Sequence, residues 1–181
     1  ACAKSLLEEG VSVVINARGE EALQETFREL SLIDKDKVSM VIADLNTDEG
    51  RKKLIESCPD ADILINNNSG PPPVNFLETD KEDWMKALDA NMLSAIFMIK
   101  DLLPGMIERN FGRIINITSA MVKSPHPLMS LSTSARTGLT AFSKGISKDV
   151  SKHNVTINNM LPERFDTDRQ VFMTEMIMEN Q

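Results

Sequence analysis

A short apolar run that ends in a series of chain-breaking residues decides the fold of this sequence. Residues 62–73 read Asp62-Ile63-Leu64-Ile65-Asn66-Asn67-Asn68-Ser69-Gly70-Pro71-Pro72-Pro73. The apolar residues 63–65 are typical of a short strand, whereas neither a helix nor a central strand can contain the Asn, Gly and Pro residues that follow. This stretch therefore predicts a strand that ends abruptly in a loop.

On both sides of this stretch, short apolar runs alternate with helical patterns. Strands are predicted at residues 11–15, 38–43, 62–66, 113–118 and 155–160. Helices are predicted at residues 3–8, 20–30, 47–57, 84–106, 132–151 and 168–180. Because each strand is followed by a helix, we expect an α/β fold of the Rossmann-like, doubly wound type, with parallel strands and helices on both faces. We expect residues 1–181 to form a single domain.

The composition indicates a soluble globular protein. The chain has 181 residues, of which 41% are hydrophobic and 26% are charged, and this length is enough to bury a core. No apolar run approaches the roughly 18 residues of a membrane-spanning helix, so no membrane contact is expected. The net charge of −7 disfavours nucleic acid as a partner.

The counts of cysteine, histidine and tyrosine narrow the chemistry further. Cys2 and Cys58 occur without a secretory signal, and we interpret them as reduced thiols of a cytoplasmic protein. The two His residues and two widely spaced Cys residues form no metal-ligand pattern, so no metal is expected. The sequence has no Tyr, and a mechanism that requires a phenol is closed to it.

The functional residues are expected where the strands end. In open parallel sheets, ligands bind beyond the carboxyl ends of the strands. The residues that follow predicted strands include Arg18, Asp44, Asn66, Ser119 and the segment 162–167.

These residues resemble those of the short-chain dehydrogenase/reductase family, and most closely its 3-oxoacyl-acyl carrier protein reductases. Residues 63–70 are similar to the family's Asn-Asn-Ala-Gly segment at the cofactor. Asn91 corresponds to the Asn of the catalytic helix, and Ser119 corresponds to the catalytic serine. Residues 162–168 resemble the Pro-Gly-x-x-x-Thr stretch over the nicotinamide, with Thr167 in register and Glu163 in place of Gly.

The sequence departs from the family pattern at the two residues that handle the proton in the family. The family has a Tyr thirteen positions after the serine and a Lys four positions later, where this sequence has Ser132 and Arg136. Reduction of a carbonyl needs an acid for the alkoxide, and the Lys lowers the pKa of that Tyr and holds the ribose. A Ser hydroxyl is a much weaker acid, while Arg136 stays protonated but can still donate hydrogen bonds to a ribose. Ser132 is alternatively interpreted as the N-cap of the helix that it opens.

The ends of the chain also depart from the family pattern. The family begins with a strand and a Gly-rich turn that cradles the pyrophosphate, whereas this sequence begins within the following helix. The family's last strand is absent as well. We expect either a fragment of a longer protein or a missing strand that is supplied in another way.

The resemblance implies a nicotinamide cofactor. Arg18 follows a strand at a place where it can meet a 2′-phosphate, so NADP is preferred over NAD. Alternatively, Arg18 is a plain surface charge. Asp44 and Leu45 resemble the adenine-contacting segment, although an Asp ahead of a helix is also a common cap. Asn66, Arg136 and Thr167 complete the predicted cofactor contacts.

Two functions are compatible with these residues. The first is an NAD(P)-dependent oxidoreductase that transfers hydride to or from an apolar carbonyl or alcohol, with Asn91, Ser119, Ser132 and Arg136 as the catalytic candidates. The alternative is a catalytically inert nucleotide-binding or oligomerisation module that has lost the Tyr/Lys pair. A homodimer or homotetramer is expected by resemblance. His126 is a candidate substitute for the missing acid. A third function, a serine hydrolase that uses Ser119 or Ser132 with His126, has little support because the sequence contains no Gly-x-Ser-x-Gly motif.

Overall fold

The strands follow the predicted order. The computed structural model describes residues 1–163, 165 and 171. Within them the strands are β1 (Val13–Ala17), β2 (Val38–Ile42), β3 (Ile63–Asn66), β4 (Gly112–Ile117) and β5 (Val155–Met160). The prediction for β5 is confirmed at both ends, and β1 begins two residues later than expected.

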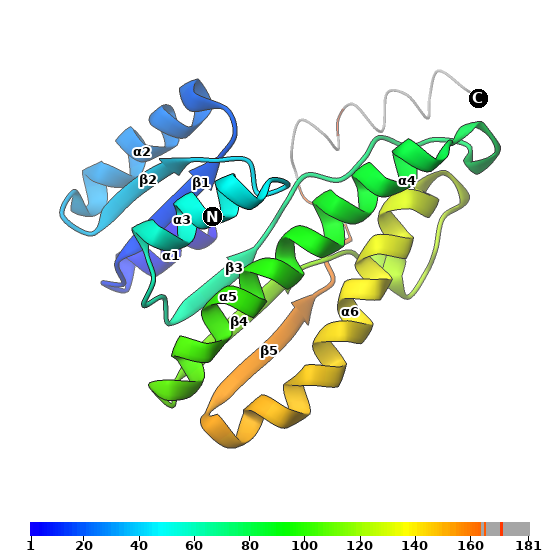
Figure 1. Ribbon diagram of the computed structural model, residues 1–181. Coiled ribbons are helices and arrows are strands. Elements are labelled where there is room, and N and C mark those ends of the chain that lie inside the picture. The colour runs from blue at the N-terminus through cyan, green and yellow to red at the C-terminus, as the bar shows by residue number, and fades with distance from the viewer. Residues whose placement is uncertain (164, 166–170, 172–181) are drawn as a thin grey trace.

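All strand pairs are parallel, as predicted. β1 pairs with β2, while β3, β4 and β5 form a second sheet with β4 at its centre. The described residues place no strand between β1 and β3, and Figure 1 shows the β1–β2 pair set beside β3. The residues of β1 are all half-buried, and among the strands that the structure describes β1 pairs only with β2.

The helices confirm the alternating order. They are α1 (Cys2–Glu8), α2 (Glu20–Asp34), α3 (Asp48–Ser57), α4 (Lys81–Leu88), α5 (Ser94–Glu108) and α6 (Ser130–Val150). Local capping explains several boundaries: Gly10 adopts φ +81° just after α1, and the Thr47 side chain accepts from Gly50 N at the start of α3. The Asp80 and Asp83 side chains form a capping box at the start of α4.

The predicted single helix over residues 84–106 is interrupted. A π-helical turn, Asp89–Leu93, separates α4 from α5. This turn contains Asn91, whose side chain is buried. π-helical turns inside helices often occur at functional sites, because the extra residue redirects the side chains around it.

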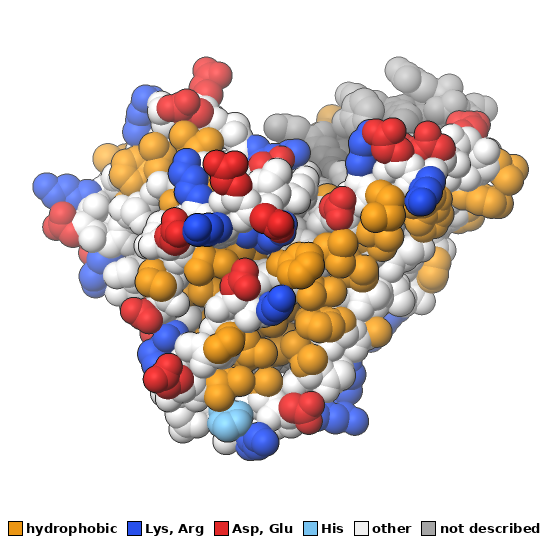
Figure 2. Space-filling view, viewed as in Figure 1, with side chains coloured by type: hydrophobic (Ala, Val, Ile, Leu, Met, Phe, Trp, Pro, Cys, Tyr) orange, Lys and Arg blue, Asp and Glu red, His pale blue; other side chains and the backbone are white. Residues whose placement is uncertain are grey.

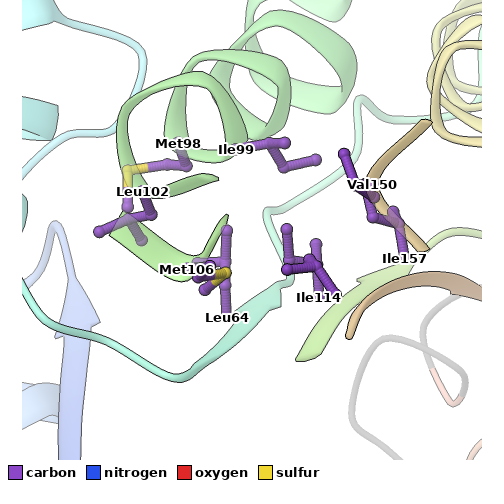
Figure 3. Close-up of a cluster of buried hydrophobic side chains, with 9 residues drawn as sticks. Leu64, Met98, Ile99, Leu102, Met106, Ile114, Val150 and Ile157 are labelled. Carbon is purple, nitrogen blue, oxygen red and sulfur yellow. The ribbon is translucent and has the colours of Figure 1, made fainter. Parts of the chain in front are cut away.

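The main core lies between α5, α6 and the second sheet. Its apolar residues interdigitate as Figure 3 shows, and Met106 and Ile114 have no exposed surface. Each fully buried side chain of this size contributes about 1.5–3 kcal/mol relative to its exposed state. The buried members of the cluster are Leu64, Met98, Ile99, Leu102, Met106, Ile114, Val150, Val155 and Ile157. A smaller cluster of Leu7, Leu30 and Val38 joins α1, α2 and β2.

Within the part of the chain that the structure describes, the helical run Lys81–Glu108 is long and apolar enough to cross a membrane by length and composition. The sequence pattern did not predict this, because charged residues interrupt the apolar positions of the run. Its buried residues, such as Met98 and Ile99, pack in the core of Figure 3. Hydrophobic side chains also gather on the outer face along this run, including Met85 and Phe97 (Figure 2).

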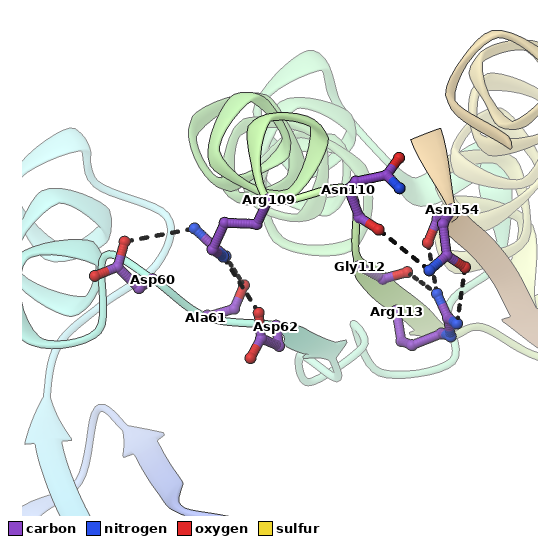
Figure 4. Close-up of polar contacts among 8 residues, drawn as sticks. All are labelled: Asp60, Ala61, Asp62, Arg109, Asn110, Gly112, Arg113 and Asn154. Atoms are coloured by element: carbon purple, nitrogen blue, oxygen red, sulfur yellow. Dashed lines mark hydrogen bonds and ion pairs between the residues drawn. The ribbon is translucent and has the colours of Figure 1, made fainter. Parts of the chain in front are cut away.

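Polar contacts fix the amino-terminal ends of β3, β4 and β5. Arg109, just after α5, donates hydrogen bonds of 3.1–3.4 Å to residues 60–62, ahead of β3 (Figure 4). Arg113 Nη1 donates to the carbonyl oxygen of Asn154 at 2.7 Å, and Asn154 Nδ2 donates to the carbonyl oxygen of Asn110 at 3.1 Å. These contacts lie at the ends of the strands opposite to the carboxyl ends, where ligands bind in parallel sheets.

Candidate active site

The candidate site lies where the loop after β3 meets the first turns of α6. The π-helical turn places Asn91 beside this loop, and Asn91 Nδ2 donates a hydrogen bond of 2.9 Å to the carbonyl oxygen of Ser69. Asn68 Nδ2 donates to the carbonyl oxygen of Ala90 at 3.0 Å. The side-chain amides of Asn68 and Asn91 thus hold the loop and the helix against one another.

Ser132 lies inside the first turns of α6 and is not its N-cap. The helix begins at Ser130, so the capping interpretation is wrong, because α6 extends two residues further back than the pattern indicated. The Ser132 side chain is buried. Its Oγ donates to Asn91 Oδ1 at 3.4 Å and accepts from Arg136 Nε at 3.1 Å. Three of the four catalytic candidates are therefore joined by hydrogen bonds.

The guanidinium of Arg136 is held by backbone carbonyl groups. Nη1 donates to the carbonyl oxygens of Ile117 at 2.7 Å and Thr118 at 3.0 Å, and Nη2 donates to that of Asn68 at 3.4 Å. Arg136 therefore connects α6 to the carboxyl end of β4 and to the loop after β3. A planar guanidinium can satisfy several carbonyls at once, whereas a Lys ammonium has fewer and more freely rotating donors.

Gly70 packs directly over this group. A Cβ atom built on Gly70 would lie 3.4 Å from Asn91 Oδ1, 3.4 Å from Ser132 Oγ and 3.6 Å from Arg136 Nη2. The backbone of the loop thus covers the polar atoms of all three side chains.

Ser119 lies next to this group in the sequence and at the same end of β4. It follows Thr118, whose carbonyl oxygen binds Arg136. The Ser119 Oγ accepts a hydrogen bond of 3.2 Å from Met121 N and so caps a short 3-10 turn, Ala120–Val122. The structure therefore places Ser119 at the end of β4 as predicted, with its oxygen engaged in local capping.

A cavity of about 290 Å³ opens between the ends of β1, β2 and β3. Arg18 and Leu45, two of the predicted cofactor residues, line it. Across the opening, Arg18 Nη2 lies 3.5 Å from Ser69 Oγ. The lining residues are Asn16, Ala17, Arg18, Gly19, Ala43, Leu45, Asn67 and Asn68.

Asp44 lies beside this cavity but is not among its lining residues. Its Oδ1 accepts from Asn46 N at 3.0 Å, and its backbone oxygen accepts from Thr47 N at 3.1 Å. The helix cap is Thr47, so the alternative interpretation of Asp44 as the cap is wrong. Gly50 approaches so closely that a Cβ there would lie 2.0 Å from the Asp44 carbonyl oxygen.

Asn66 does not line the cavity either. Its side-chain Nδ2 donates to Asn116 Oδ1 at 2.8 Å, within a row of amides that runs across the second sheet. No residue pattern signals this row, because the pairing of Asn66 with Asn116 depends on the register of β3 with β4.

Some predicted residues fall outside this arrangement. Thr167 and most of the tail 168–180 lie outside the described residues. His126 lines a different cavity, of about 510 Å³, together with Ser130 and Thr133, and is not joined to Ser132. Among the residues that the structure describes, no group of three or more His, Cys, Asp or Glu side chains could hold a metal.

Comparison with known proteins gives a consistent result. The family model described as short chain dehydrogenase matches residues 1–177. Among similar proteins, the uncharacterized oxidoreductase YvrD of Bacillus subtilis is 34% identical over 165 residues, which cover 90% of this chain and 62% of YvrD. The 3-oxoacyl-[acyl-carrier-protein] reductase FabG of Haemophilus influenzae is 29% identical over 191 residues, covering all of this chain and 73% of that protein.

A solved structure agrees with these relatives. L-sorbose reductase from Gluconobacter frateurii, in complex with NADPH and L-sorbose, superimposes with a TM-score of 0.91 at 26% identity. The match covers 99% of this chain and 70% of that one. The chain thus spans between about three fifths and three quarters of the length of these proteins. On the family match and the shared fold, the chain belongs to the short chain dehydrogenase family.

Proposed function

We propose that this protein is an NAD(P)-dependent oxidoreductase that transfers hydride between a nicotinamide and an apolar carbonyl or alcohol. The observation that carries the proposal is the joining of Asn91, Ser132 and Arg136 at the carboxyl ends of β3 and β4. A substrate of the 3-oxoacyl thioester type is the first candidate, in keeping with the likeness to FabG.

The residues suit a nicotinamide dinucleotide at its adenosine end. The 290 Å³ cavity offers the guanidinium of Arg18 and the amides of Asn67 and Asn68. A guanidinium matches a phosphate bidentately, so we assign Arg18 to the 2′-phosphate of NADP in preference to NAD. Leu45 would contact the adenine, with Asp44 beside it. Asn66 and Thr167 are retained as further contact residues by resemblance.

The bound cofactor supplies the hydride, and the protein's own residues serve the substrate and the proton. Ser119, at the end of β4, would hold the carbonyl oxygen, and Arg136 would hold the ribose. Asn91 would organise a water molecule beside Ser132. Since the loss of a positioned general acid typically costs on the order of 10²–10⁴-fold in rate, we expect slow turnover with Ser132 in place of a phenol.

The direct test measures cofactor binding and turnover separately. NADPH and NADH are titrated by nucleotide fluorescence into the protein, into Arg18→Ala and into the exposed control Arg28→Ala. We expect NADPH to bind more tightly than NADH, and Arg18→Ala alone to remove the difference. Turnover is then measured with a panel of 3-oxoacyl thioesters and ketones. Cofactor binding without any turnover would overturn the oxidoreductase proposal.

We further propose that residues 1–181 act as one Rossmann-like unit of a cytoplasmic homodimer or homotetramer. The exposed apolar side chains along α4 and α5, such as Phe97, supply a surface of the kind that subunits bury (Figure 2). Light scattering coupled to size exclusion measures the number of subunits.

A second candidate function is an inert nucleotide-binding or oligomerisation module. The observation in its favour is that Ser132 and Arg136 are engaged by protein groups. The hydroxyl hydrogen of Ser132 is directed to Asn91, and Arg136 binds the carbonyl oxygens of Ile117 and Thr118. Measurable turnover that Ser119→Ala abolishes would refute this candidate.

A further inference from the structure

Helix α6 is tied to β4 by side-chain hydrogen bonds at two places. Arg136 donates to the carbonyl oxygens of Ile117 and Thr118. Two helical turns further on, the Oγ of Ser143 accepts from Asn116 Nδ2 at 3.0 Å. Residues seven positions apart lie on the same face of a helix, separated by about 10 Å along its axis. Both ties therefore meet the consecutive residues 116–118, at the carboxyl end of β4 and just after it, from one face of α6.

The second tie belongs to a buried row of polar side chains. Asn66, Asn116 and Asn159 occupy paired positions on β3, β4 and β5. Asn116 accepts from Asn66 at 2.8 Å and donates to Asn159 Oδ1 at 3.1 Å as well as to Ser143. Asn116 and Ser143 have no exposed surface. Hydrogen bonds in such a site are directional and costly to leave unmade.

We propose that Asn116 and Ser143 are positioning residues for Arg136. Apolar packing between α6 and the sheet is non-directional and permits small shifts of the helix along and around its axis. The Asn116–Ser143 bond selects one such position, in which Nη1 of Arg136 reaches the carbonyl oxygens of Ile117 and Thr118. The proposal rests on the proposed function at one point, the assignment of Arg136 to the ribose of the nucleotide.

The test observes Arg136 itself. In 15N-labelled protein, the Nη1–H signals of Arg136, whose hydrogen bonds cross to β4, are identified by their absence in Arg136→Lys. Ser143→Ala removes the acceptor of Asn116. Its control is Ser147→Ala, one turn further along α6, where an exposed hydroxyl bonds only to Lys144 O. We expect exchange of the Arg136 Nη1–H groups with solvent to quicken by about fivefold to tenfold in Ser143→Ala, the factor that corresponds to one hydrogen bond, and to stay unchanged in the control.

Two outcomes would overturn the proposal. The first is an unchanged Arg136 signal in a Ser143→Ala protein with native far-ultraviolet circular dichroism. The second is an equal effect of Asn159→Ala, which removes the acceptor on β5 but leaves the tie to α6. If Ser143→Ala does not fold, Ser143→Cys, whose thiol is a weak acceptor of similar shape, takes its place in the same measurement. Because the measurement needs no cofactor, its failure is separate from a failure of the proposed oxidoreductase function.

Discussion

Arg136 and Ser132 lie one helical turn apart on α6, and Arg136 Nε donates a hydrogen bond of 3.1 Å to Ser132 Oγ. The donors then follow one direction: Ser132 donates to Asn91, and Asn91 donates to the carbonyl oxygen of Ser69. In this arrangement the hydroxyl hydrogen of Ser132 is engaged, so Ser132 cannot donate to a substrate until its bond to Asn91 breaks.

Replacement of Arg136 will lower stability. Arg136→Ala leaves the carbonyl groups of Ile117, Thr118 and Asn68 without this partner, and we expect the free energy of unfolding to fall by about 2 kcal/mol. Arg136→Lys should retain part of this stabilisation, since one ammonium group cannot reach all three carbonyl oxygens. Urea unfolding measures the change, with exposed Arg28→Ala as the control. Equal midpoints for Arg136→Ala and Arg28→Ala would contradict the structural role.

Installing the missing acid tests the site as a catalyst. Ser132→Tyr combined with Arg136→Lys supplies a phenol beside a Lys, and we expect NADPH-dependent ketone reduction to rise about 100-fold over the parent. Reduction is followed by the absorbance of NADPH. Ser132→Phe with Arg136→Lys is the matched control, because it adds the same ring without the hydroxyl. If the Phe variant matched the Tyr variant, proton donation would not be the cause of the gain.

Two glycines should respond in opposite directions to the same substitution. Gly50→Ala would place a Cβ 2.0 Å from the Asp44 carbonyl oxygen, a backbone atom that cannot move aside freely. We expect it to lower the free energy of unfolding by about 3 kcal/mol. Gly145 lies within α6 with nothing within 4 Å of a built Cβ, and Gly145→Ala should add about 0.5–1 kcal/mol. Thermal unfolding measures both, and a Gly50→Ala protein with the parent Tm would contradict the close contact.

Cys58 should make stability depend on pH in the alkaline range. Burial, with the nearby carboxylates of Asp60 and Asp62, raises the pKa of the Cys58 thiol above its ordinary value. The folded protein therefore keeps this proton where the unfolded chain loses it. Its contribution is intact below about pH 8.5 and is lost as the pH rises through the folded pKa.

Urea unfolding between pH 7.5 and 10 measures this dependence. Cys58→Ser should flatten the decline in the free energy of unfolding, whereas Cys2→Ser, at an exposed position, should leave it as in the parent. An identical decline in the parent and in Cys58→Ser would show that the thiol is not its source.

The sequence predicts correctly those features that neighbouring residues determine. The helix over residues 47–57 and the strand Val155–Met160 follow from residue types within a few positions, and both are confirmed. The π-helical turn at Asn91 was not predictable, because the apolar spacing continues through it. The position of Ser132 was misjudged for a related reason, since the helix start depends on the preceding 3-10 turn, Pro127–Met129.

The partners of Arg136 were beyond sequence reasoning on other grounds. They are backbone carbonyl oxygens, which every residue possesses, so no residue type signals them. Their convergence depends on the register of β3 with β4 and on where α6 crosses the sheet. The spacing shared with the family nevertheless predicts Ser132 and Arg136 as site residues. In the structure these two side chains are joined by a hydrogen bond.

The loop after β3 contacts both the cavity lined by Arg18 and the group of Asn91, Ser132 and Arg136. Ser69 lies 3.5 Å from Arg18 through its hydroxyl, on the side of the cavity, and accepts from Asn91 through its carbonyl oxygen, on the side of Ser132. Ser69 thus contacts residues on both sides of the loop. Because a substitution at Ser69 removes the hydroxyl but keeps the carbonyl oxygen, we expect it to act on the side of Arg18 first and to reach Asn91 only through a shift of the loop.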